Sequence, residues 1–168
     1  MQINVPLTNG LLADEYGKYA PTNLMIADHP IKSFPITITD VPAGTKSLSL
    51  VFYDVDSTPV CGFPWIHWLA ANIPATMTTI PANASRELAD QFIQGKNSNA
   101  GALVNGDARI TQGYVGPQPP DETHYYTLRV DALDQTLPLA NGYWLNDYVH
   151  AAKGHVLTSA NIDLPSRA

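Results

Sequence analysis

Three short segments of the chain place carboxylates, imidazoles and a phenol where they could hold a charged ligand. Asp54 and Asp56 follow one apolar run, and His67 begins a second. His124 and Tyr126 open a third. A carboxylate within about 4–6 Å of an imidazole favours the protonated ring and fixes its orientation. Two imidazoles held in this way would bind a phosphate, a sulfate or a carboxylate.

A glycine- and proline-rich segment, residues 113–120, is a candidate for a further wall of such a pocket. Glycines such as Gly113 and Gly116 permit positive-φ turns, which point successive backbone N–H groups into one concavity. Pro117, Pro119 and Pro120 stiffen the segment and lower the entropy lost on binding. We therefore expect backbone amides of this loop to face the same anion.

The elements that must position these residues are mainly strands. Short β-branched and aromatic runs bounded by Pro, Gly or Asp predict strands over residues 47–53, 66–73 and 125–133, and alternation predicts a fourth over 34–39. The helical spacing of Leu145, Tyr148, Val149 and Ala152 predicts one late helix, with Asn141 as a candidate cap. Its end is open, either at Gly154 or near residue 159. A short helix is expected over 11–18, and residues 74–123 carry many turn formers without periodicity.

Side-chain alternation predicts which face of each strand carries the polar groups. In the first strand the even positions are apolar and lead into Asp54 and Asp56, whereas Ser47 and Ser49 face solvent or a second layer. In the third strand the apolar positions extend backwards through Tyr126 to His124. In the second strand His67 shares its parity with Leu69, Ala71 and Ile73. Each strand would thus bring polar groups to the margin of the core.

Composition narrows the class of protein. A chain of 168 residues with 45% hydrophobic and 14% charged residues is typical of a single folded domain spanning 1–168, not of a disordered chain. A net charge of −6 without a basic cluster argues against nucleic acid as a partner. The single cysteine, Cys61, allows no internal disulfide and no multi-cysteine metal site, and we expect no metal or cofactor. Without a signal-like start or an 18-residue apolar run, a cytoplasmic protein is expected.

Several motifs in the same order resemble the phosphatidylethanolamine-binding protein family. They are Asp54-Val55-Asp56-Ser57-Thr58-Pro59, Ile66-His67-Trp68, Asn72-Ile73-Pro74-Ala75, and the stretch from Gly113-Tyr114-Val115-Gly116-Pro117 to His124-Tyr125-Tyr126. Val41-Pro42-Ala43-Gly44-Thr45, Asp131-Ala132-Leu133-Asp134 and Gly154-His155-Val156-Leu157 are similar to the bacterial and archaeal Raf-kinase-inhibitor-like branch, typified by YbhB and YbcL. The resemblance covers roughly residues 33–160.

The resemblance implies a mainly β fold, a two-sheet antiparallel Greek-key sandwich with a C-terminal helix near the mouth of a small pocket. It implies a non-catalytic binding protein, not an enzyme, that takes phosphate-bearing small molecules or phospholipid head groups, and a possible homodimer. The ligand-binding residues it implies are Asp54, Asp56, His67, Gly113, Gly116, Pro117, His124 and Tyr126.

The chain departs from the family at four places. Residues 34–38 replace the usual Pro-x-Leu-x-Trp, Gln118 replaces a Cys, Tyr125 replaces a basic residue, and residues 162–165 lack the usual Gly-x-Tyr. The last departure removes one possible wall of the pocket.

Two alternatives stay open. One is a hydrolase that uses Asp54 and Asp56 or a histidine as acid and base, although the chain contains no GxSxG nucleophile motif. The other is a regulator of a protein partner, in the manner of a kinase or protease inhibitor.

Overall fold

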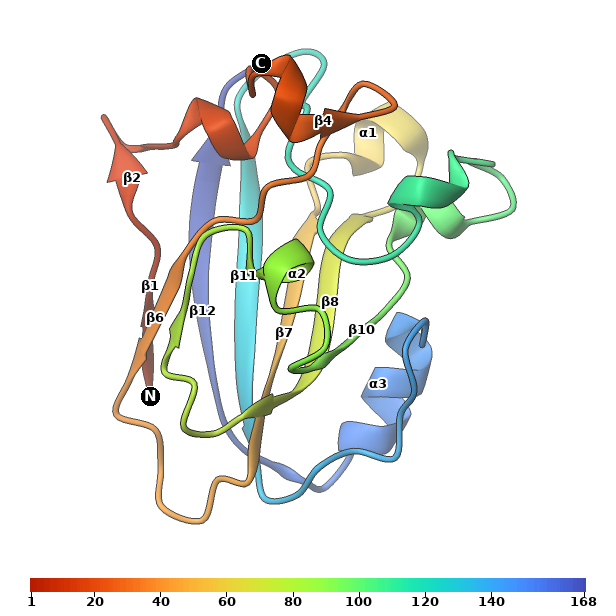
Figure 1. Cartoon of the computed structure of the whole chain (residues 1–168). Helices are drawn as coiled ribbons and strands as arrows, with labels where there is room; N and C mark the ends of the chain where they lie inside the picture. The colour runs from red at the N-terminus through yellow and green to blue at the C-terminus, as the bar shows by residue number, and fades with distance from the viewer.

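Strands form most of the regular structure in the computed structural model, which describes residues 1–168 (Figure 1). The strands are β1 Gln2–Asn4, β2 Leu7–Thr8, β3 Leu11–Leu12, β4 Met25–Ile26, β5 His29–Pro30, β6 Ile36–Thr39, β7 Ser47–Asp54, β8 Trp65–Pro74, β9 Thr79–Ile80, β10 Ile93–Gln94, β11 His124–Leu133 and β12 Val156–Ser166. The α-helices are α1 Thr58–Cys61, α2 Ala84–Glu87 and α3 Leu145–Ala152, and single 3-10 turns occur at Asp14–Tyr16, Thr22–Leu24, Ser98–Ala100 and Ala108–Ile110. The four predicted strands are confirmed as β6, β7, β8 and β11.

Two antiparallel sheets face each other. The larger has the order β10-β8-β7-β11-β12 and the smaller has the order β1-β6-β9; β2-β3 and β4-β5 are separate hairpins. The chain crosses between the sheets repeatedly, because β6 and β9 lie in one sheet while β7, β8 and β10 lie in the other. The mainly β, antiparallel fold class predicted from the sequence is therefore confirmed.

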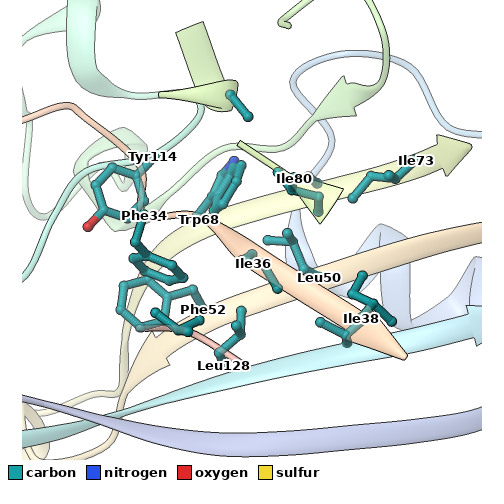
Figure 2. Packing of buried hydrophobic residues seen from close by; sticks show 14 of the residues in the cluster. Phe34, Ile36, Ile38, Leu50, Phe52, Trp68, Ile73, Ile80, Tyr114 and Leu128 are labelled. Carbon is teal, nitrogen blue, oxygen red and sulfur yellow. The ribbon is translucent and has the colours of Figure 1, made fainter. Parts of the chain in front are cut away.

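The main hydrophobic core lies between the two sheets. The predicted apolar faces of β7 and β11 are confirmed, since Leu50 and Val130 both belong to this core. Phe34 is fully buried at its centre and packs edge-on against Phe52 and Trp68, with ring centroids 5.0 and 6.4 Å away (Figure 2). The aromatic packing braces the end of the sheet from which the polar residues project.

The face predicted for β8 was wrong, because β-bulges interrupt the alternation of its side chains. Phe52 pairs with Trp68 but Tyr53 pairs with Ile66, so His67 is an extra residue in the ladder. The bulge turns His67 toward the ring of Phe52, 5.6 Å away, on the side of the main core. Leu69 and Ala71, expected beside it, belong instead to a second cluster on the other face of the sheet.

A second bulge in β8 returns Ile73 to the main core. Leu48 pairs with Ile73 and Leu50 pairs with Ala70, which leaves an additional residue on β8. Asn72 lies in this interval with a φ of 57°, a left-handed conformation that Asn tolerates better than most residues. Its side-chain amide donates to the Leu137 carbonyl at 2.9 Å.

Helix α3 packs on the outer face of the large sheet, not at the mouth of a pocket near β7 and β11, as the resemblance implied. In Figure 1 it lies in the lower half of the view, beside the large sheet and apart from α1. Tyr148 of α3 donates to buried Asp131 of β11 and shares a hydrogen bond with Ser49 of β7. Ser49 therefore faces a second layer rather than solvent, and Ser47 is buried as well, with its hydroxyl donating to the Gln135 carbonyl.

The ends of α3 also differ in part from expectation. Asn141 does not cap the helix, because its side-chain oxygen accepts from the backbone amide of Gln94. At the helix start the Asp147 carboxylate accepts from the backbone amide of Trp144 instead. The helix stops before Gly154, whose φ is 83°, and residues 156–166 form β12, a strand that the sequence analysis did not predict. The helix expected over 11–18 is only the 3-10 turn Asp14–Tyr16.

The long segment between β8 and β11 is held by buried amide side chains. Gln94 accepts from the Trp68 indole at 2.8 Å and from the Ser85 hydroxyl at 2.7 Å. Asn97 donates to the carbonyls of Ile110 and Gly113 at 2.8 and 3.0 Å. These bonds fix the approach of residues 113–120 to the end of the sheet.

No helix of the structure is long and apolar enough to span a bilayer.

Candidate functional site

A cavity of about 260 Å³ opens at the end of the large sheet where β7 stops and β11 starts. Figure 1 shows α1 close to this end of the sheet. Because β7 and β11 are antiparallel neighbours, with Asp54 paired to Tyr126, the polar residues at these two ends meet. The cavity is lined by His29, Asp54, Ser57, Val60, Cys61, Trp65, His67, Val115, Gly116, Gln118, Pro119, Pro120, His124 and Tyr126.

The Asp54 carboxylate is held in place by the turn that follows β7. One oxygen, Oδ1, accepts from the backbone amide of Ser57 at 3.2 Å. The Ser57 hydroxyl donates to the carbonyls of Asp54 and Phe63 at 2.8 and 3.0 Å and accepts from the Trp65 amide at 2.9 Å. The turn leaves the other carboxylate oxygen, Oδ2, for the site.

His124 lies between two carboxylates. Its Nδ1 is 2.8 Å from Oδ2 of Asp54, and its Nε2 is 3.0 Å from Oδ1 of Asp121. Burial disfavours the charged ring, but the hydrogen bonds to Asp54 and Asp121 outweigh it and raise the pKa of His124 above its ordinary value. The structure therefore favours a buried imidazolium at this position.

His67 has the opposite electrostatic environment. Burial lowers its pKa from 6.5 to about 4, because the ring is packed between Phe52 and Tyr126. Its Nδ1 is 2.7 Å from the Val115 carbonyl, which can only accept, so Nδ1 carries the proton. The other ring nitrogen, Nε2, has no hydrogen-bond partner. Because no fully buried side-chain nitrogen or oxygen of the structure lacks a partner, Nε2 is not fully buried and reaches the cavity that His67 lines. It offers a lone pair to the cavity.

Replacing His67 with asparagine is expected to flatten the pH dependence of stability on the acid side. Between pH 6.5 and about 4 the unfolded chain binds a proton that the folded ring excludes. The stabilisation due to neutral His67 is complete above pH 6.5 and is lost as the pH falls, by about 3 kcal/mol in total. Urea unfolding of both proteins from pH 7 to pH 4 measures this term. The asparagine amide can keep the bond to Val115, and parallel profiles for the two proteins would contradict the prediction.

Tyr126 closes the inner wall beside the two histidines. Its ring meets that of His67 edge-on at 5.1 Å and lies 6.2 Å from that of His124. Burial, together with the neighbouring Asp54 carboxylate, raises the pKa of the Tyr126 hydroxyl far above its ordinary value. The phenol is therefore a neutral hydrogen-bonding group throughout the physiological pH range.

The amides of residues 113–116 do not form the expected anion cradle, because each already has a partner. The amides of Gly113, Val115 and Gly116 donate to backbone carbonyls, and that of Tyr114 donates to the Ser85 hydroxyl. Only Gly113 has the positive φ anticipated for both glycines. Gly116 is needed for a different reason, since a Cβ at this position would lie 2.1 Å from the Tyr16 carbonyl oxygen.

His29 is a pocket residue that the sequence analysis missed. It follows a two-residue hairpin turn in which Ala27 and Asp28 both have positive φ, as the tight β4–β5 connection requires. Its Nδ1 lies 2.6 Å from the Ala27 carbonyl. Gln118, noted only as a departure from the family, donates from Nε2 to the Asp28 carbonyl at 2.9 Å and so ties this turn to the pocket loop.

The structure brings most of the predicted ligand-binding residues to the cavity, but not all. Asp54, His67, Gly116, His124 and Tyr126 line it. Three do not line it: the Asp56 carboxylate accepts from the Tyr125 amide at 2.8 Å, Gly113 lies against the side chains of Ser85 and Gln94, and Pro117 is buried next to Gly17.

Two antiparallel sheets and a small acid–histidine pocket at one end of the larger sheet define the class of this protein. The chain belongs to the phosphatidylethanolamine-binding protein family, whose sequence profile it matches over residues 3–166. This confirms the resemblance inferred from the motifs.

Individual relatives place the chain in the bacterial and archaeal branch. It is 46% identical over 160 residues to the uncharacterised protein YxkA of Bacillus subtilis, with 95% of each chain covered. The crystal structure of Escherichia coli YbcL, described as a new member of the mammalian PEBP family, superposes with a TM-score of 0.76 at 26% identity over 99% of this chain and 98% of that one. A Chlamydia trachomatis homologue shares the fold, with a TM-score of 0.78 at 23% identity over 99% and 97% of the two chains.

Proposed function

We propose that this chain is a non-catalytic binding protein whose pocket takes the phosphate-bearing end of a small molecule or a phospholipid head group. The observation that carries the proposal is the pair of imidazoles that line one cavity in different surroundings, His124 between two carboxylates and His67 bonded only to a backbone carbonyl. His124 supplies positive charge braced by Asp54, and His67 supplies an unpartnered Nε2. Both ring nitrogens of His124 are occupied by carboxylates, which favours binding over a role as general base.

The neutral state of His67 favours a phosphate monoester over the diester of a phospholipid head group. An Nε2 without a proton accepts a hydrogen bond, so it matches a phosphate that still carries one P–OH group. A phosphate monoester gains that proton near pH 6. In addition, a bound anion favours the protonated form of a nearby imidazole. Both effects require the affinity for phosphate monoesters to increase as the pH falls.

Titration with O-phosphoethanolamine at pH 5.5 and 7.5, followed by NMR of the histidine rings, tests the proposal. We expect tighter binding at pH 5.5, and we expect His67→Asn to weaken that binding about tenfold or more, because the hydrogen bond between Nε2 and the charged phosphate group is lost. His150→Asn is the matched control, since His150 is exposed on α3 and away from the cavity.

Two further ligands distinguish the possible sources of the phosphate. Inorganic phosphate tests the bare anion, and glycerophosphoethanolamine tests a phospholipid head group, whose diester has no P–OH group to donate. Equal responses of the wild type and His67→Asn to all three ligands would reject the pocket as the binding site.

A further inference from the structure

Asp121 contacts the one ring nitrogen of His124 that Asp54 leaves available to donate to a ligand. Its Oδ1 lies 3.0 Å from Nε2 of His124, the ring nitrogen that Asp54 does not use. The two carboxylates differ in burial: the Asp54 side chain is 4% exposed and that of Asp121 is 58% exposed. Asp54 is fixed within the fold, whereas the Asp121 side chain reaches Nε2 from a solvent-exposed position just before β11.

We propose that the Asp121 carboxylate is an internal competitor that a bound phosphate must displace from His124. The inference rests on the proposed function and assigns to Asp121 the role of a specificity-determining residue. The Asp121 side chain is 58% exposed, so water solvates it again when it leaves, while the bound anion takes over its hydrogen bond from the buried His124 ring. Displacing Asp54 would instead leave a buried charge without its partner, which is far more costly.

The competitor determines which anions can enter. A carboxylate ligand would only replace the Asp121 carboxylate at Nε2 of His124 with another carboxylate. It would be at a disadvantage, because Asp121 is tethered to the chain and so has a high effective concentration at the ring. A phosphate has a further oxygen and more charge, and it can reach the Nε2 of His67 in addition. Asp121 therefore selects phosphate over simple carboxylates.

The charges that face this position come from several elements. Asp54 at the end of β7, His67 on β8 and His29 at the start of β5 line the cavity. Asp121 and Glu122 precede β11 and lie outside that lining. Glu122 is exposed, has no hydrogen bond to His124, and carries the same charge one residue away. It therefore provides a matched control for long-range charge.

Titration of the wild type, Asp121→Asn and Glu122→Gln with inorganic phosphate and with acetate tests the proposal, with the His124 ring resonances as the readout. We expect Asp121→Asn to tighten phosphate binding about threefold to tenfold relative to Glu122→Gln, and to make acetate binding measurable. Asp121→Ala, which removes the competing acceptor altogether, is expected to have at least the same effect. Repeating the series with O-phosphoethanolamine shows whether replacing Asp121 also tightens the binding of an esterified phosphate.

Two results would overturn the inference, and they are distinguishable. Equal phosphate affinities for Asp121→Asn and Glu122→Gln would show that only net charge matters, and would leave the proposed phosphate site in place. Absence of phosphate binding in every variant would overturn the proposed function and this inference together.

Discussion

Replacing Gly116 with alanine is expected to lower the free energy of unfolding by about 3 kcal/mol or more. The added Cβ would lie 2.1 Å from the Tyr16 carbonyl oxygen and 2.9 Å from Cγ of Pro30. The backbone at this position cannot simply retreat, because the Gly116 amide donates to the Pro30 carbonyl at 2.8 Å. Relief therefore requires residues 113–120 to move away from the N-terminal segment, and urea unfolding measures the cost.

Gly44→Ala is the matched control for this substitution. Gly44 has a φ of 89°, but a Cβ added there would have no neighbouring atom within 4 Å, so alanine meets only conformational strain, of about 1 kcal/mol. If Gly116→Ala proved no more costly than Gly44→Ala, the close approach to Tyr16 would not be a constraint on the fold. Because Gly116 lines the cavity, we also expect the destabilised variant to bind phosphate more weakly.

Truncating Asp131 to alanine is expected to cost about 3 kcal/mol, because it removes the acceptor at the centre of a buried network. The Asp131 side chain is 1% exposed and accepts from Tyr148, Ser159 and Arg129. Without it the hydroxyls of Tyr148 and Ser159 lose their shared partner, and α3 keeps only the Tyr148–Ser49 hydrogen bond to the sheet. Chemical unfolding monitored by far-UV circular dichroism measures the loss.

Tyr148→Phe gives the graded comparison, since it removes a single hydroxyl from the same network and should cost about 1 kcal/mol. Asp131 and Tyr148 are not among the residues that line the pocket containing His124. Both variants should therefore retain phosphate affinity wherever they remain folded. A loss of stability in Asp131→Ala no larger than that in Tyr148→Phe would contradict the central role assigned to the carboxylate.

The sequence predicted the central strands because their burial follows simple alternation. Strands β7 and β11 have one continuous apolar face, and their polar ends meet because they are direct neighbours in the sheet. Strand β12 was not predicted because it is an edge strand whose residues are mostly exposed or half-buried. Alternation in β8 failed where the bulges at His67 and Asn72 break the period.

The candidate site was predicted where its residues lie at strand ends and missed where they arrive through tertiary contacts. His29 is 25 residues before Asp54 in the sequence, and only the packing of the β4–β5 hairpin brings it to the cavity. The loop amides had the expected glycines nearby, but local sequence does not show that other backbone carbonyls satisfy them. Likewise, the competing contact of Asp121 depends on a ring orientation that Asp54 fixes from another strand.

The additional residue in β8 makes the pocket sensitive to chain length as well as to side-chain chemistry. Because His67 faces Phe52 only through the bulge, an in-frame deletion of the codon for Ile66 would restore regular alternation and turn the imidazole toward α3. The large sheet could keep its pairing while the ligand pocket disappeared. A single deletion could thus remove the binding pocket from a relative that keeps the fold and both histidines.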